Sequence, residues 1–201
     1  MPEGFRPVDG LLHVHGALFT GWVALMVIQP LLIATRNVGI HRKLGYAGAA
    51  IAAAMFVAGH MAGIAAMHGG FIGLGDPLVF YAIPFMAINS FGLFAALAIY
   101  WRNRAETHKR LILLANVPLL EAAIARIPFE PIGAGAPFTF IFLPNVLIIA
   151  GMIYDWRTRR RIHPAWIWGG LAMLALEVVR FPMMASPGWH DFAAMMAALW
   201  A

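Results

Sequence analysis

Three long stretches of this sequence contain no charged side chain, and they constrain the fold more than any other feature. They cover residues 11–35, 44–75 and 77–101. Each exceeds the about 20 residues that an α-helix needs to cross the hydrocarbon core of a bilayer. With 62% hydrophobic and 11% charged residues, the chain also has too little polar surface for a water-soluble globule. Strands of a barrel would alternate apolar and polar residues, so we predict an all-α integral membrane protein.

We predict six membrane spans in a single transmembrane domain, residues 1–201, that forms a helical bundle. The spans are placed at about 11–34, 44–67, 78–101, 108–127, 137–156 and 164–184. The fourth is the least regular, because only fifteen residues separate Arg110 from Arg126 and Pro118 interrupts them. A re-entrant or packed helix is the alternative there.

Basic residues concentrate in alternate loops. The first, third and fifth loops hold Arg36, Arg42 and Lys43; Arg102, Arg104, Lys109 and Arg110; and Arg157, Arg159, Arg160 and Arg161. The loops between them carry Asp76 and Glu130. By the positive-inside rule the basic loops face the cytoplasm of a bacterial inner membrane, and both termini lie outside. The net charge of +5 therefore reflects topology, and we do not expect a nucleic-acid partner.

The basic turns also resemble one another. In each, an arginine is followed five or six residues later by a histidine: Arg36 and His41, Arg102 and His108, Arg157 and His163. This weak repeat predicts three αα-hairpins that close on the cytoplasmic side, with chance similarity as the alternative. The tail 188–201 carries apolar residues at helical spacing, which predicts a short interfacial helix or otherwise a frayed terminus.

Ionisable residues within the outer halves of the spans are the strongest functional signal, because charged groups in the hydrocarbon are costly. His15, His60, Glu121 and Glu177 lie roughly 6 to 11 Å inside the outer ends of their spans at 1.5 Å per residue. A bundle that directs them inward would place them together in one outer pocket.

One use of that pocket is a b-type haem. His15 and His60 would be its axial ligands, and Arg126 and Arg180 would pair with its propionates.

Two other uses remain open. Glu121 and Glu177 could join the two imidazoles around a metal ion such as iron, copper or zinc. Alternatively, the carboxylates pair with Arg126 and Arg180 and only hold helices together. A contact within one helix is possible for Glu177 and Arg180, whereas Glu121 needs a partner elsewhere in the fold.

A second candidate set lies at the inner ends of two helices. Cations at a helix N-terminus oppose the macrodipole, so we expect an anion there, and an anionic phospholipid phosphate fits. The set consists of His41, Arg42, Lys43, His108, Lys109 and Arg110. The alternative is a metal ion or a second haem held by His41 and His108, with His163 as a third candidate ligand.

Several of these motifs resemble a family of uncharacterised bacterial multi-pass membrane proteins. They are His15-Gly16, Gln29-Pro30, His41-Arg42-Lys43-Leu44-Gly45, His108-Lys109-Arg110-Leu111 and His163-Pro164-Ala165-Trp166. The resemblance implies a membrane bundle and no particular activity. The two basic turns are also similar, more weakly, to oxidase-assembly membrane proteins and helical b-type cytochromes, which implies haem chemistry. Such cytochromes place paired histidines on facing helices, whereas here the outer pair, His15 and His60, occupies adjacent spans.

Two functional hypotheses follow. The first is a redox or cofactor-associated role with b-type haem at the outer layer. The second is a non-enzymatic accessory or assembly subunit of a respiratory or other membrane complex. Whether the chain is an enzyme is left open by the sequence.

Overall fold

The computed structural model describes residues 10–68, 76–124 and 136–200, with side chains from 143 onward in the last range. This part of the chain is helical and contains no strand. The helices are α1 (Gly10–Ala34), α2 (Val38–His68), α3 (Pro77–Tyr100), α4 (Ala105–Asn116), α5 (Leu119–Ile124), α7 (Ala136–Arg159), α8 (Pro164–Met184) and α9 (Pro187–Ala198).

Four of the described helices are long and apolar enough to cross a membrane, namely α1, α2, α3 and α8. Their mean hydropathy over 18 residues lies between 1.4 and 2.0. A membrane-embedded helical protein, as the sequence predicts, is therefore supported. This finding supports four crossings and does not establish the six that the sequence predicts.

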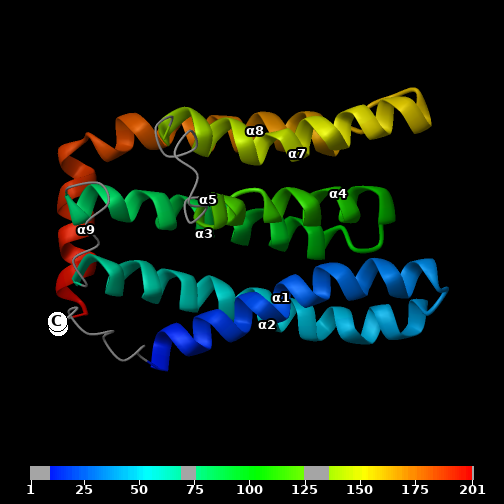
Figure 1. Cartoon of the computed structure of the whole chain (residues 1–201), viewed down its shortest axis with the longest axis horizontal. Coiled ribbons are helices and arrows are strands. Elements are labelled where there is room, and N and C mark those ends of the chain that lie inside the picture. Colours follow the sequence, from blue (N-terminus) through cyan, green and yellow to red (C-terminus); the bar gives the residue numbers. More distant parts are fainter. Residues whose placement is uncertain (1–9, 69–75, 125–135, 201) are drawn as a thin grey trace, which may run out of the picture.

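The long helices run side by side, and the turns after α1, α3 and α7 lie at one end of the bundle, on the right in Figure 1. Each helix packs on the next along the chain: α1 on α2, α2 on α3 and α3 on α4. The later helix α8 packs against α3, α4 and α7. Helix α9 lies across the opposite end of the bundle (Figure 1).

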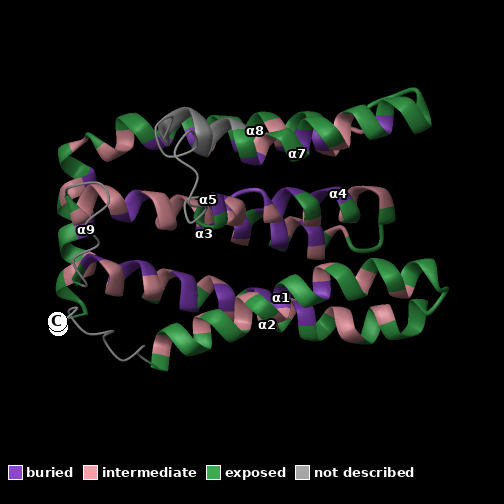
Figure 2. Cartoon of the chain, viewed as in Figure 1, coloured by how far each residue is buried: buried purple, intermediate pink, exposed green. Residues whose placement is uncertain are grey.

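The core follows the central helices, and Figure 2 shows buried positions on the facing sides of α2, α3 and α4. Large side chains fill it, among them Met55, Phe91, Phe94 and Leu114, each at most 2% exposed. Small residues let the backbones approach, as expected for helices that associate in lipid. At Gly59, a β-carbon would lie 2.7 Å from the Ile88 side chain.

The predicted fourth span, 108–127, begins earlier than expected and is interrupted. Helix α4 starts at Ala105 and ends at Asn116, and α5 resumes at Leu119. Pro118 explains the break, because proline has no backbone N–H to donate and its ring clashes with the preceding turn. The second span also starts early, at Val38, so His41, Arg42 and Lys43 lie within helix α2 and not before it.

Helix α1 ends in a turn that fixes the first basic loop. Arg36 has a φ of 62°. The Asn37 N–H donates to the Leu32 carbonyl at 2.7 Å, and the Arg36 N–H donates to Ile33 at 3.1 Å. This is the Schellman arrangement, which closes a helix through a left-handed residue.

The C-terminal segment is an ordered helix packed on the bundle. The Ser186 hydroxyl caps α9 by accepting from the Trp189 N–H at 3.2 Å. The indole of Trp189 donates to the Leu78 carbonyl at 2.8 Å and stacks on Tyr81. These contacts tie α9 to α3 at the end of the bundle away from the basic turns.

Candidate functional site

Three charged side chains meet inside the bundle, in the half that contains α9. Short helix α5 supplies Glu121, and α8 supplies Glu177 and Arg180. Their exposed fractions are only 3%, 5% and 4%. Glu177 and Arg180 are three residues apart in α8, so both project from the same side of that helix.

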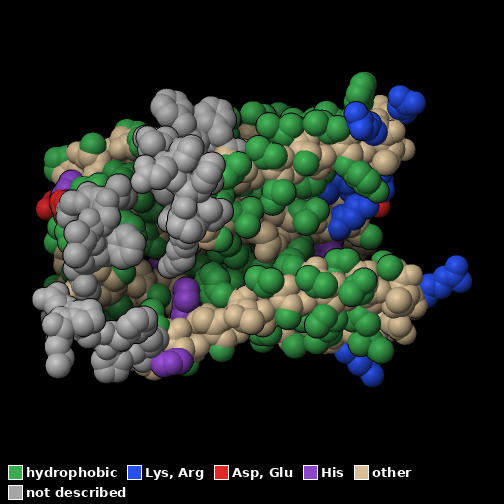
Figure 3. Space-filling model, viewed as in Figure 1, with side chains coloured by type: hydrophobic (Ala, Val, Ile, Leu, Met, Phe, Trp, Pro, Cys, Tyr) green, Lys and Arg blue, Asp and Glu red, His purple; other side chains and the backbone are tan. Residues whose placement is uncertain are grey.

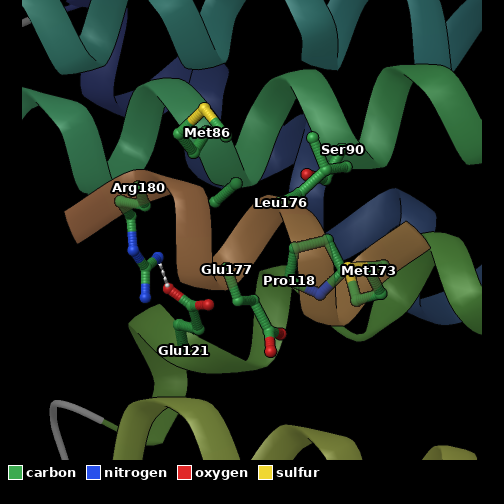
Figure 4. Close-up of a pocket in the computed structure, with 9 residues that line it drawn as sticks. Met86, Ser90, Pro118, Glu121, Met173, Leu176, Glu177 and Arg180 are labelled. Carbon is green, nitrogen blue, oxygen red and sulfur yellow. Dashed lines mark hydrogen bonds and ion pairs between the residues drawn. The ribbon is translucent and has the colours of Figure 1, made fainter. Parts of the chain in front are cut away.

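Two hydrogen bonds arrange this outer cluster, which we define as Glu121, Glu177 and Arg180. Arg180 Nη1 donates to Glu121 Oε2 at 2.6 Å, which Figure 4 shows as a dashed line. Asn145 Nδ2, from α7, donates to Glu177 Oε2 at 2.6 Å. The outer cluster therefore joins α5, α7 and α8.

A small cavity lies against the outer cluster, lined also by Ser90 of α3 and Pro118 (Figure 4). Its volume is about 10 Å³, close to the minimum for one water molecule. Glu177 Oε1 is buried and has no hydrogen-bond partner within the described part of the chain. Two carboxyl groups, those of Glu121 and Glu177, thus lie beside a space of this size.

The pairing differs from the one the spacing suggested. The sequence allowed Glu177 to pair with Arg180 in the same helix, but the guanidinium donates to Glu121 and Glu177 receives the Asn145 amide. Asn145 thereby holds α7 against α8. Arg126, the predicted partner of Glu121 or of a propionate, lies outside the described residues.

The two outer histidines do not line the cavity of the outer cluster. The His15 ring stacks on Phe19, with ring centres 4.1 Å apart. The His60 ring packs edge-on against Phe56 and Phe85, and its Nε2 lies 3.4 Å from Asn89 Nδ2.

These contacts bear on both cofactor hypotheses. Among residues 10–68, 76–124 and 143–200, no group of three or more His, Asp or Glu side chains is arranged to hold a metal ion. Arg180, expected at a haem propionate, is already hydrogen-bonded to Glu121. Haem ligation by His15 and His60 stays a prediction.

At the inner end, a second charged network centres on Arg110, which is 1% exposed. Its Nε donates to Asp155 Oδ2 at 2.8 Å, and its Nη2 donates to the other Asp155 oxygen. Its Nη1 donates to Glu106 Oε2 at 2.7 Å. This network joins α4 to the end of α7.

Arg110 and Lys109 thus already have carboxylate partners within the protein, and a lipid phosphate at these two residues stays a prediction. Lys109 Nζ lies 3.1 Å from a Glu106 oxygen, and Glu106 also pairs with Arg159 at 2.5 Å. The hydrogen bond from Arg110, with further bonds from Arg159 and Lys109, lowers the pKa of Glu106 to about 2 despite some burial. Arg42 and Lys43 are exposed, and a lipid phosphate at His41, Arg42 and Lys43 stays a prediction.

Two of the inner histidines have local roles that the sequence did not reveal. His108 Nδ1 lies 2.9 Å from the Ala98 carbonyl, across the turn that joins α3 to α4. His163 caps α8, because its Nδ1 accepts the Ala165 N–H at 3.1 Å. These contacts favour structural roles over the three-histidine ligand set predicted with His41.

Sequence reasoning missed Asp155 and Glu106 altogether. A signal was present at Asp155, because an acid near the C-terminal end of a helix is disfavoured by the macrodipole and therefore points to a cationic partner. The sequence also suggested no role for His68 and His190. His68 Nε2 lies 3.0 Å from the Ala197 carbonyl, and His190 Nε2 lies 3.4 Å from Asp76, so both hold α9 against the bundle.

No protein-family model, curated protein or solved structure matches the chain. Function must therefore be argued from the two buried charged networks themselves.

Proposed function

We propose that this chain is a six-span protein of the bacterial inner membrane, built as three hairpins, in which the outer cluster binds and releases one proton. The basic turns would face the cytoplasm and both termini the outside. In support, the turns after α1, α3 and α7 lie at one end of the bundle. Figure 3 shows the visible Lys and Arg side chains gathered at that same end, as the positive-inside rule requires.

The fourth crossing would combine α4 and α5, and the fifth would be α7. Helix α7 has 24 residues, which exceeds the about 20 that a crossing needs. Helices α4 and α5 have 12 and 6 residues, and the break at Pro118 is compatible with a crossing because neighbouring helices shield it from lipid.

The observation that carries the proton-binding proposal is the charge count of the outer cluster. Two carboxyl groups face one guanidinium, and all three are at least 95% buried. If both carboxyls were ionised, one negative charge would remain uncompensated within the described residues, in a medium of low dielectric constant, at a cost of several kcal/mol. The outer cluster is electrically neutral when it holds one proton.

Glu177 is the residue that would hold this proton. Glu121 receives a charged donor, Arg180, whereas Glu177 receives the neutral amide of Asn145. A carboxylate bonded to a guanidinium is stabilised more strongly than one bonded to an amide. Glu177 Oε1 has no hydrogen-bond partner within the described residues, and Glu177 lines a cavity close to the size of one water, so a water bound there would accept the proton.

Infrared difference spectroscopy between wild type and variants tests this proposal, because among protein groups only a protonated carboxyl group has a C=O stretch above the amide bands, and the lipid ester band cancels in the difference. The protein is reconstituted in nanodiscs at neutral pH, and the band is measured in the wild type and in single variants. We expect one buried carboxyl band in the wild type and none in Glu177→Gln. Glu121→Gln should also lose it, because Glu177 would then ionise against Arg180.

Arg180→Gln should give the opposite result, a doubled band, because two carboxyls would remain without a cation. Glu106→Gln is the matched control and should leave the band unchanged. Absence of any buried carboxyl band in the correctly folded wild type would overturn the proposal. That result would favour purely structural pairing and, with it, the accessory-subunit hypothesis.

A further inference from the structure

A second cavity lies at the opposite end of the bundle, at the turn between α7 and α8. It has a volume of about 380 Å³ and is lined by Arg159, Arg161, Ile162, His163 and Pro164. This volume is within the range of small-molecule sites. Two of its five lining residues are arginines and none is acidic, so its chemistry differs from that of the outer cluster.

The surroundings of this inner cavity carry an excess of positive charge. Three cationic side chains, Lys109, Arg110 and Arg159, pair with two carboxylates, Glu106 and Asp155. Arg161 lines the cavity as a fourth cation. Glu106 alone receives three cations. Four cations against two carboxylates leave a net charge of +2 beside the cavity, and Arg161 is the one of the four that forms no hydrogen bond or ion pair within the described residues.

His163 adds an oriented hydrogen-bond donor. Its Nδ1 accepts from the Ala165 N–H, so in the neutral ring the proton resides on Nε2. Burial, and then the charge of Arg110, lower the pKa of His163, which keeps the ring neutral near pH 7. A neutral imidazole with a fixed tautomer presents one N–H to a ligand.

The backbone contributes no free N–H at this point of α8. The His163 N–H donates to Asp155 at 3.2 Å, the Ala165 N–H donates to the His163 ring, and Pro164 has none. Recognition of an anion here would therefore rest on side chains, with the positive end of the α8 dipole adding to the attraction.

We propose that the inner cavity binds a phosphate group, with Arg161 and Arg159 as its charged donors and His163 as a neutral donor. Arginine suits this ligand because its planar fork matches phosphate oxygens. The phosphate would come either from an anionic phospholipid headgroup at the cytoplasmic surface or from a soluble phosphate compound. The site is distinct from the basic helix starts at His41 and His108.

The test measures binding to the full chain by the ligand-dependent rise in Tm. One arm titrates inorganic phosphate against protein in phospholipid-free detergent. The other arm compares nanodiscs of phosphatidylcholine alone with nanodiscs that also contain phosphatidylglycerol. Arg161→Gln is the main variant. Arg157→Gln is the control, because it removes a charge from the same basic segment without lining the cavity.

We expect Arg161→Gln to weaken binding about fivefold, since one arginine near an anionic surface contributes about 1 kcal/mol, and Arg157→Gln to change it much less. Dependence on Arg161 in the phosphate arm would identify a soluble ligand, and dependence in the phosphatidylglycerol arm alone would identify a lipid. The proposal is overturned if neither arm depends on Arg161. Equal weakening by Arg157→Gln would also overturn it, because attraction would then be unspecific.

Discussion

Replacing Asp155 by asparagine removes the charge that balances Arg110 while preserving side-chain shape. Arg110 is 1% and Asp155 2% exposed, and two guanidinium nitrogens donate to the carboxylate. Removing one partner of a buried ion pair typically costs about 3–5 kcal/mol. Because asparagine keeps one acceptor oxygen and Glu106 still contacts Arg110, we expect the free energy of unfolding to fall by about 3 kcal/mol, the lower end of that range.

Reversible unfolding in detergent micelles, followed by tryptophan fluorescence, measures this loss. Glu106→Gln is the control: its side chain is 44% exposed, so water screens its ion pairs, and the loss should be smaller than for Asp155→Asn. The double variant Arg110→Met with Asp155→Leu should recover most of the stability, because an apolar pair leaves no buried charge.

Two results would refute this reasoning. One is a fall in the free energy of unfolding of less than about 0.5 kcal/mol for Asp155→Asn, which is the usual range of a surface substitution. The other is a double variant that is no more stable than Asp155→Asn, because the cost would then not come from an unpaired charge.

Three further predictions concern other parts of the chain. The pKa of Glu106 is lowered to about 2 in the folded protein. Its ionised form therefore stabilises the fold above pH 4.5, the ordinary pKa, and this stabilisation is lost as the pH falls towards 2. The difference in unfolding free energy between wild type and Glu106→Gln should shrink over that interval, and an increase would contradict the prediction. Gly151→Ala should lower the free energy of unfolding by about 1–3 kcal/mol through overpacking, because a methyl group there would overlap the Trp166 ring. Gly188→Ala has open space around it and should lower it less. Equal Tm values for the two variants would contradict the packing of Gly151 against Trp166. If haem binds, the dithionite-reduced spectrum of the purified protein shows a haem band that His15→Ala and His60→Ala each abolish; a fully folded protein without that band ends the haem hypothesis.

Local signals in the sequence located most helices. The span expected at 11–34 is α1, Gly10–Ala34, and the span expected at 164–184 is α8, Pro164–Met184. The ends of these helices lie where apolar runs meet turn residues and prolines, so a few neighbouring positions are enough to locate them. Pro118 likewise predicts the interruption that separates α4 from α5.

The partners of buried charges could not be found in this way. Arg110 meets Asp155 at a separation of 45 residues, and Arg180 meets Glu121 at 59. Spacing along one helix says which side a residue faces, but the partner depends on how separate helices pack. Of the outer residues, Glu121, Glu177 and Arg180 are buried as the sequence predicts. Glu121 has its partner on another helix, as expected, but the contact allowed between Glu177 and Arg180 is replaced by one between Arg180 and Glu121.

The sidedness of the basic turns is the claim on which the proposed topology and both proposed sites depend. The chain contains no cysteine, so single cysteines can be introduced on a silent background. Asn37→Cys, Asn103→Cys and Thr158→Cys probe the three turns, and Asp191→Cys probes α9. Labelling with a membrane-impermeant maleimide should modify the first three only in inverted vesicles and Asp191→Cys only in right-side-out vesicles. Labelling of any one turn from the opposite side to the other two would contradict the account.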